Sequence, residues 1–380
     1  MPFFCFDRNR PHKSSKVRIL EVDVWSEGHA SVTMRWHVEQ GGIMGLFDHW
    51  HPVLPASKLG TKPTKITLGG RDITLFRTAS GAVGAVDDCC VHRRASLSNG
   101  TVIGERLQCG YHGWTYDTNG QAESPGTPKL RACARHYDVT ISEDFVWIKG
   151  AGAEAELPKF DTDGYEFVCA KPYLIKAPLE VVLDNFTEVE HTPTTHANFG
   201  YDLSRMSEVK TSVEGTDDSV RVVNSGPQKK TPWIVQQLAG LKTGDTFTDD
   251  WVTYFSPVYT VYEQFWNDPK NGRERRDRYR IWVFFNPISN QETQLMIFAY
   301  LRARTAARRA FIQLTRPILA FIVDIEVQCD VKMIESLADK SPEIEGMKLS
   351  RFDKVLGMNR ERINRIYRGQ SAPMHEEASV

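Results

Sequence analysis

Two short pairs of cysteine and histidine constrain this chain more than any other feature of its sequence. Cys90 and His92 form the first pair, with one residue between them, and Cys109 and His112 form the second, with two residues between them. Sixteen residues separate the pairs. Thiolate and imidazole are both good ligands for zinc and iron. Four such residues in this order and spacing predict one metal site held by two loops, rather than four unrelated core side chains.

The mixed composition of the pairs indicates which metal the loops would hold. Two cysteines and two histidines can close a tetrahedron around zinc, but zinc fingers pair cysteine with cysteine and histidine with histidine. Each pair here contains one of each. Two mixed pairs suit a cluster of two irons in which one iron binds both thiolates and the other binds both imidazoles, the ligand set of a Rieske centre. Such a cluster carries single electrons at roughly −150 to +300 mV. Cys89 lacks the Cys-x-His spacing, and we interpret it as a packing residue.

A second candidate metal site lies near residues 178–191, a stretch that begins with a proline suited to the first position of a helix. A helix through this stretch would place three polar side chains on one face, Asp184, Glu188 and His191. Pro193 must end the helix, so His196 comes from the following turn and can converge with His191. Two histidines alone indicate a helix C-terminus as readily as a metal site. A carboxylate from elsewhere would complete the set of ligands that binds iron(II) and leaves positions open for O₂ and water.

The sequence around the cysteine and histidine pairs predicts a small β domain. Residues 50–148 consist of short strand-like segments and turns, in which Gly69-Gly70 and Asn119-Gly120 suit hairpin turns. Glycine, proline and acidic residues then cluster at 150–164, a composition typical of a linker. Residues 1–45 carry no motif, and we interpret them as a leading hairpin or an arm that contacts a partner.

Beyond the linker the pattern changes to a mixture of strands and helices. Strand-like aromatic segments at 251–262 and 278–285 flank a turn at Asn271-Gly272. Helical patterns follow at 305–337 and 350–367. Helices packed on an antiparallel sheet are therefore expected, and the fold class of the chain is predicted to be α+β.

Together the two motifs resemble the catalytic subunits of the Rieske non-haem iron oxygenases. About eighty residues separate the first block from a second one with the family's spacing, formed by Asn185, Glu188, His191 and His196. The resemblance covers about residues 45–370. It implies an N-terminal Rieske β domain followed by a helix-grip (START/Bet v1-like) catalytic domain, divided as follows: extension 1–45, Rieske domain 46–155, catalytic domain 156–370 and tail 371–380.

The resemblance also implies the third ligand of a mononuclear iron, an aspartate on a late helix. Asp330 is followed five residues later by Glu335, as is usual in the family, whereas Asp324 lacks this neighbour. The expected iron ligands are therefore His191, His196 and Asp330, with Asp324 as the alternative to the last of these.

Glu188 and Asn185 are the other expected site residues. Family members commonly have aspartate at the position of Glu188, where the carboxylate bridges a Rieske histidine of one subunit to an iron-binding histidine of its neighbour. Glutamate keeps the charge and is one methylene longer. Asn185 matches a nearby amide of the family, and a helix-surface role is its alternative.

As a function, the resemblance implies oxidation of a small organic, aromatic or cyclic substrate with O₂. The product would arise by monooxygenation, such as hydroxylation, demethylation or N-oxygenation, or by dioxygenation. Electrons would come from NAD(P)H through a flavin reductase, directly or through a ferredoxin, to the [2Fe-2S] cluster and then to Fe(II) in the neighbouring subunit of a homotrimer. Two alternatives remain: a Rieske electron-transfer protein, and a module that binds a hydrophobic ligand.

Two sets of side chains in the second half invite narrower expectations. Aromatic residues on its strand-like segments are candidates for a cavity wall, although most such residues belong to cores: Trp251, Tyr254, Tyr259, Phe265, Trp282 and Phe284. The basic run at 273–280 is interpreted as a solvated turn, with docking of an acidic ferredoxin as the alternative.

Composition limits the partners and the compartment. The chain has 380 residues and a net charge of −1, which gives no broad electrostatic case for binding nucleic acid. The N-terminus has no apolar core of signal-peptide length, and the longest apolar run, at 317–323, is too short to cross a bilayer. Seven cysteines, an odd number with two in the metal motif, match a disulfide scaffold poorly. We expect a soluble, cytoplasmic protein with no membrane or nucleic acid partner.

Overall fold

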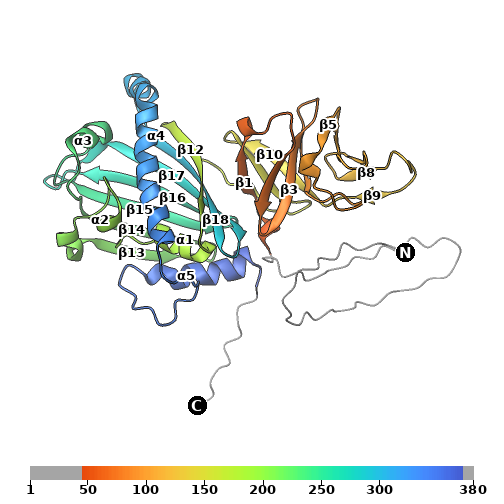
Figure 1. Ribbon diagram of the computed structural model, residues 1–380. Helices are drawn as coiled ribbons and strands as arrows, with labels where there is room; N and C mark the ends of the chain where they lie inside the picture. The colour runs from red at the N-terminus through yellow and green to blue at the C-terminus, as the bar shows by residue number, and fades with distance from the viewer. Residues whose placement is uncertain (1–44, 371–380) are drawn as a thin grey trace, which may run out of the picture. The chain divides into compact units, whose positions relative to one another are not determined.

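The computed structural model describes residues 45–370 (Figure 1). The expectations for the N-terminal extension, apart from its last residue, and for the tail at 371–380 lie outside the described residues. Three antiparallel sheets and five α-helices make up the described part, which confirms the α+β class. No helix in the range 45–370 is both long enough and apolar enough to span a membrane.

The first half of the described chain forms two sheets. The larger has the order β1-β11-β10-β4-β3-β2, with the bounds β1 His51–Pro55, β2 Thr64–Leu68, β3 Arg71–Arg77, β4 Val83–Asp87, β10 His136–Ser142 and β11 Phe145–Gly150. The predicted turn between β2 and β3 is confirmed: Gly69 and Gly70 both have positive φ, 58° and 75°, which side chains other than glycine rarely adopt.

The smaller sheet runs in chain order from β5 to β9, and loops next to its strands carry the second Cys/His pair. Its strands are β5 Thr101–Ile103, β6 Arg106–Gln108, β7 Thr115–Tyr116, β8 Gln121–Glu123 and β9 Ala132–Cys133. A buried cluster of Phe76, Leu97, Leu107 and Tyr116 packs with both cysteines of the predicted metal site. The loops are therefore supported by a core that strands of both sheets build.

The second half of the described chain is one seven-stranded sheet with helices against it. Its strand order is β12-β18-β17-β16-β15-β14-β13, with the bounds β12 Tyr165–Ile175, β13 Lys210–Gly215, β14 Ser219–Pro227, β15 Thr246–Phe255, β16 Val258–Asn267, β17 Glu274–Ser289 and β18 Glu292–Arg302. The helices are α1 Leu179–Phe186, α2 Thr192–Thr195, α3 Trp233–Ala239, α4 Ala306–Glu335 and α5 Lys354–Arg362. Figure 1 shows the long helix α4 lying across one face of this sheet.

Two details of the predicted elements are wrong. The segment 251–262 is two strands, because the chain turns at Ser256-Pro257 between β15 and β16. The helix at 178–191 ends at Phe186, and Pro193 belongs to the separate short helix α2. At the end of α1, Thr187 leaves the helical conformation and its hydroxyl donates a hydrogen bond to the carbonyl of Leu183. The helix therefore ends before Glu188 and His191.

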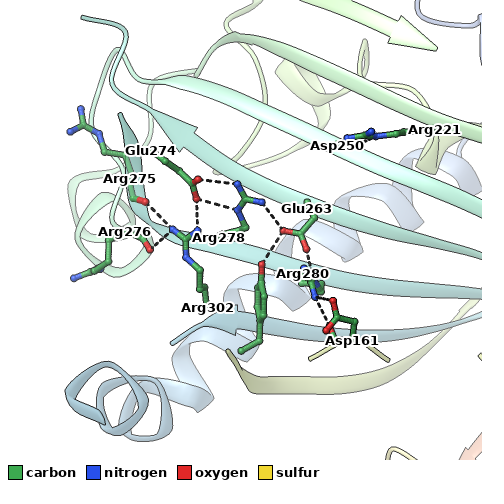
Figure 2. Close-up of polar contacts among 11 residues, drawn as sticks. Asp161, Arg221, Asp250, Glu263, Glu274, Arg275, Arg276, Arg278, Arg280 and Arg302 are labelled. Carbon is green, nitrogen blue, oxygen red and sulfur yellow. Dashed lines mark hydrogen bonds and ion pairs between the residues drawn. The ribbon is translucent and has the colours of Figure 1, made fainter. Parts of the chain in front are cut away.

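The basic run at 273–280 is not a solvated turn. Most of it lies on β17, where its arginines pair with carboxylates of the same strand, of the neighbouring strand β16 and of the segment before β12 (Figure 2). Arg278 binds Glu274 and Glu263, and Arg280 binds Glu263 and Asp161. Because these charges are paired within the chain, the run offers less free positive charge to an acidic partner than its sequence indicates.

Candidate active site

The first Cys/His pair follows β4 and the second follows β6, each in a tight loop. The amide of Arg94 donates to the carbonyl of Cys90 at 2.8 Å, and the amide of Gly113 donates to the carbonyl of Cys109 at 3.1 Å. Gly113 has φ of +73°, a conformation that favours glycine. Each loop thus turns back on its cysteine and presents the following histidine beside it.

These loops bring two thiols and two imidazoles together. The ring centroids of His92 and His112 lie 4.6 Å apart, and Trp114 stacks on His92 at 5.1 Å. Both cysteines are buried, and the hydroxyl of Tyr116 donates to the sulfur of Cys90 at 3.1 Å. Burial raises the pKa of the Cys109 thiol, as expected where a positive metal is needed to stabilise the thiolate. This donor set fits a Rieske cluster, with a hydrogen bond to one of its sulfur ligands.

The second set of predicted ligands converges from α2 and α4. His191 is the N-cap of α2, His196 follows its last residue, and Asp330 projects from α4. One carboxylate oxygen of Asp330 lies 3.3 Å from Nε2 of His191 and 3.4 Å from Nε2 of His196, and the two Nε2 atoms are 3.1 Å apart. Three ligand atoms within 4.8 Å of one another can hold one metal ion. Two imidazoles and one carboxylate fit iron(II) with open positions.

In both His191 and His196, a carboxylate lies beside Nδ1, the ring nitrogen that does not face Asp330. Glu188 contacts Nδ1 of His191, and Oε2 of Glu326 lies 3.0 Å from Nδ1 of His196. Asn198 fixes Glu326 through its backbone and side-chain amides, which donate to the other carboxylate oxygen at 3.0 and 2.6 Å. Such partners orient metal-binding imidazoles and raise their basicity.

Glu326 was missed by sequence reasoning, although it stands four residues before Asp330 on the same helix. That spacing places both carboxylates on one face of α4. Asn185 donates to Oδ1 of Asp330 at 3.0 Å, so its side chain lies at the site. Asp184, predicted to share a face with Glu188 and His191, instead binds Arg360 of α5 at 2.8 and 2.6 Å, because α1 ends before the other two.

The other candidate aspartate has different partners. Asp324 accepts a hydrogen bond from the Tyr173 hydroxyl at 2.9 Å and lies 3.3 Å from Nζ of Lys171, both on β12. The three atoms that could hold a metal include Asp330 and not Asp324.

The charges of the second set perturb one another. Burial alone would lower the pKa of His191, but hydrogen bonds to Asp330 and Glu188 raise it to about 10. Burial opposes ionisation of Asp330, but His196 and His191 lower its pKa below the usual range. The carboxylate of Asp330 is therefore ionised at neutral pH, in the form that binds a metal ion.

A cavity of about 130 Å³ adjoins these three residues, between α4 and the seven-stranded sheet. Its sheet wall follows the alternation of a strand, since residues two apart share a face. Of the six aromatic residues expected at a cavity, Trp251 lines it and the other five do not. Trp282 and Phe284 instead pack with Phe145 and Trp147 on the face of the sheet away from the cavity. Their neighbours on β17, Ile281 and Val283, point the other way and line the cavity.

Asp249 is an acidic residue of this wall that sequence reasoning also missed. It is 6% exposed, and burial raises its pKa to about 7, against the effect of a hydrogen bond from Gln264 on the neighbouring strand. Asp249 and Asp250 are adjacent in the sequence, and the pattern of β15 does not indicate which of the two side chains faces the cavity.

Comparison with known proteins gives one family match within the first half of the chain. Residues 49–136 match the Rieske [2Fe-2S] domain. Methylxanthine N1-demethylase NdmA of Pseudomonas putida is 31% identical over 169 residues, which cover 40% of this chain and 48% of the relative. Methylxanthine N3-demethylase NdmB of Pseudomonas putida is 28% identical over 263 residues, which cover 64% of this chain and 70% of the relative. Protein TIC 55 of Arabidopsis thaliana is 27% identical over 231 residues, which cover 56% of this chain and 43% of the relative. The chain thus spans about half the length of several curated relatives.

Solved structures agree over most of the chain. Dicamba monooxygenase bound to 3,6-dichlorosalicylic acid superposes with a TM-score of 0.71 at 18% identity, covering 85% of this chain and 97% of the other. NdmA with caffeine gives a TM-score of 0.64 at 20% identity, covering 85% and 94%. Residues 49–136 are thus a Rieske [2Fe-2S] domain, and over most of its length the chain shares its fold with dicamba monooxygenase and NdmA.

Proposed function

We propose that this protein oxidises a small organic substrate with O₂, using electrons delivered singly from NAD(P)H by a reductase. The observation that carries the proposal is the convergence of His191, His196 and Asp330 on an apolar cavity in a chain that also has a Rieske domain. An electron-transfer protein would need only the Rieske domain. In this proposal residues 46–155 carry electrons and residues 156–370 perform the oxidation.

Each proposed site residue has a definite task. Cys90, Cys109, His92 and His112 would hold the cluster, and His191, His196 and Asp330 would hold the iron. When bound, the cluster supplies electrons one at a time and the iron supplies the site where O₂ reacts. Glu188 and Glu326 orient the two iron-binding imidazoles, while Asn185 holds the carboxylate of Asp330. The apolar cavity wall excludes water and positions the substrate beside the three ligands.

The relatives support a small substrate. NdmA and NdmB are named as methylxanthine demethylases, and dicamba monooxygenase has been solved with dicamba. Hydroxylation, demethylation, N-oxygenation and dioxygenation all remain reactions that such a site can perform.

We further propose a cyclic homotrimer in which each Rieske domain serves the iron of the next subunit. Glu188, which already contacts one iron-binding histidine, would also reach a Rieske histidine of the neighbour. A head-to-tail contact that closes by rotation gives a ring. A flavin reductase, with or without a ferredoxin, would supply the electrons in the cytoplasm.

Iron analysis of the purified protein tests the proposed function. An oxygenase requires three irons per chain, two in the cluster and one at the second site. Two irons per chain would favour an electron carrier, and none would favour a binding module in which neither metal site functions.

A further inference from the structure

Four buried polar atoms of residues that line the cavity have no hydrogen-bond partner among the described residues. Two of them, Nδ1 of His196 and Oε2 of Glu326, lie 3.0 Å apart as an ion pair. The other two are Oδ1 of Asp249 and Nε1 of Trp251, and both side chains line the cavity. Asp249 is 6% exposed and Trp251 is 1% exposed. The two residues stand two apart on β15, so their side chains leave the same face of the strand.

Such atoms are informative because buried polar groups in native proteins are nearly always hydrogen-bonded. A carboxylate oxygen accepts hydrogen bonds, whereas an indole N–H only donates them. A ligand that satisfies both atoms must therefore carry a donor for Asp249 and an acceptor for Trp251. The remaining wall is largely apolar, including Phe247, Ile281, Val283 and Leu319.

The charges around the cavity have one sign. Four carboxylic acids line it, Glu188, Asp249, Glu326 and Asp330, and the lining residues in the described part of the chain include neither lysine nor arginine. The two lining histidines belong to the metal site. A carboxylate ligand would thus meet acidic groups with no cation of the chain to pair with, whereas an amine would meet complementary charge.

The size of the cavity restricts the ligand further. Its volume of about 130 Å³ is close to that of an engineered cavity of roughly 150 Å³ that binds benzene. A single aromatic ring with small substituents matches this space.

We propose that the cavity selects a compact aromatic compound with an amino N–H donor, which Asp249 binds, and an acceptor, which Trp251 binds. The inference rests on the proposed function, since the bound ring would be the substrate of the oxygenase.

Probe binding to the iron-loaded protein tests this selectivity. Isothermal titration is performed with benzylamine, with toluene, which lacks the donor, and with benzoate, which replaces the amine by an anion. We expect benzylamine to bind at least about tenfold more tightly than toluene, because hydrogen bonds between charged groups are the strong ones. Benzoate should bind more weakly than toluene. Benzoate affinity equal to or above that of benzylamine would overturn the proposal.

A matched pair of variants locates the selectivity. Asp249→Asn should weaken benzylamine binding by about tenfold. The affinities for benzylamine and benzoate should then differ less than they do in the unsubstituted protein. Asp250→Asn is the control. Asp250 is the next residue of β15, its carboxylate lies 2.7 Å from the guanidinium of Arg221, and it does not line the cavity; Figure 2 labels both residues. Its benzylamine affinity should match that of the unsubstituted protein. Equal effects of the two substitutions would contradict the role of Asp249.

A third variant addresses the acceptor. Trp251→Phe keeps an aromatic wall but removes the indole N–H, so 4-methoxybenzylamine, whose ether oxygen can accept a hydrogen bond, should lose affinity relative to benzylamine. Identical losses for the two probes would contradict the role of Trp251.

The iron content of each sample separates two kinds of failure. Three irons per chain without amine selectivity would sink only the inference about the substrate. Amine selectivity in a protein that cannot hold the mononuclear iron would instead contradict the proposed oxygenase function. Because Asp249→Asn keeps all three proposed iron ligands, amine binding directly to the iron would be insensitive to that substitution.

Discussion

The carboxyl group of Asp249, which we propose binds the ligand, lowers the stability of the folded protein when it is ionised. Its pKa is raised by burial to about 7, from an ordinary value of 3.8. Between these pH values the folded protein keeps the proton that the unfolded chain has released, so the free energy of unfolding falls as pH rises from about 4 to 7. The group is therefore unfavourable to folding at neutral and higher pH, which is typical of residues retained for function.

Asp249→Asn should remove this penalty. At pH 8 we expect the variant to be more stable than the unsubstituted protein by up to about 4 kcal/mol, from 1.36 kcal/mol per pKa unit. At pH 5.5 the gain in stability should be about half as large, because only the part of the pKa shift of Asp249 between 3.8 and 5.5 then destabilises the folded protein. Urea unfolding at the two pH values measures both gains. A gain that is larger at pH 5.5 than at pH 8 would show that the carboxyl group is not held protonated by the fold.

Glu326 is the second residue with a role that follows from its contacts. Glu326→Gln keeps the shape of the side chain but removes the charge beside His196, so iron(II) affinity at the second site should fall by about tenfold or more. Competition with a chelator measures that affinity. Asp324→Asn is the control on the same helix, since Asp324 binds Tyr173 and Lys171 instead. If the two variants lose iron equally, Glu326 does not orient His196.

At the scale of elements, the cluster loops depend on a close approach of two backbones. A Cβ at Gly100 would lie 2.2 Å from the carbonyl oxygen of Gln108, the residue before Cys109. Gly100 has extended backbone angles, so the constraint is space rather than conformation. The two strands that meet here, β5 and β6, lead into the second Cys/His loop.

Gly100→Ala should therefore destabilise the smaller sheet by about 1–3 kcal/mol, the usual cost of overpacking. We expect a lower melting temperature and less Rieske absorbance per chain. Gly126→Ala provides the comparison, because a Cβ there would meet nothing within 4 Å and its φ is not positive. Equal melting temperatures for the two variants would mean that the contact with Gln108 is easily relieved.

The same elements show what could be predicted from sequence. The strands around Gly69-Gly70 and the helix at 305–337 carry local signals, turn glycines and helical periodicity, and both were predicted. The end of α1 at Phe186 was not, because a hydroxyl of Thr187 and a contact with Asn359 on α5 decide it. Glu326 and Asp249 were missed for a related reason. Their roles depend on which face of α4 and β15 meets the histidines, and that is settled by tertiary packing.

At the scale of the whole molecule, the proposed ring makes a prediction that no single chain can. His92→Ala removes a proposed cluster ligand, Asp330→Ala removes a proposed iron ligand, and each variant alone should be inactive. Oligomers that mix the two should recover part of the activity, because some junctions place an intact cluster next to an intact iron. Co-expression followed by an assay of product tests this. Mixed oligomers that form and stay inactive would indicate electron transfer within one chain.

The central claim is that two separate metal sites coexist in this chain and that Asp330 belongs to the second. Its most direct test is iron content together with electron paramagnetic resonance of the dithionite-reduced protein, for Asp330→Ala and Asp324→Ala. We predict two irons per chain and an unchanged Rieske signal for Asp330→Ala, and three irons with the same signal for Asp324→Ala. Three irons in Asp330→Ala, or loss of its Rieske signal with the mononuclear iron retained, would contradict the assignment.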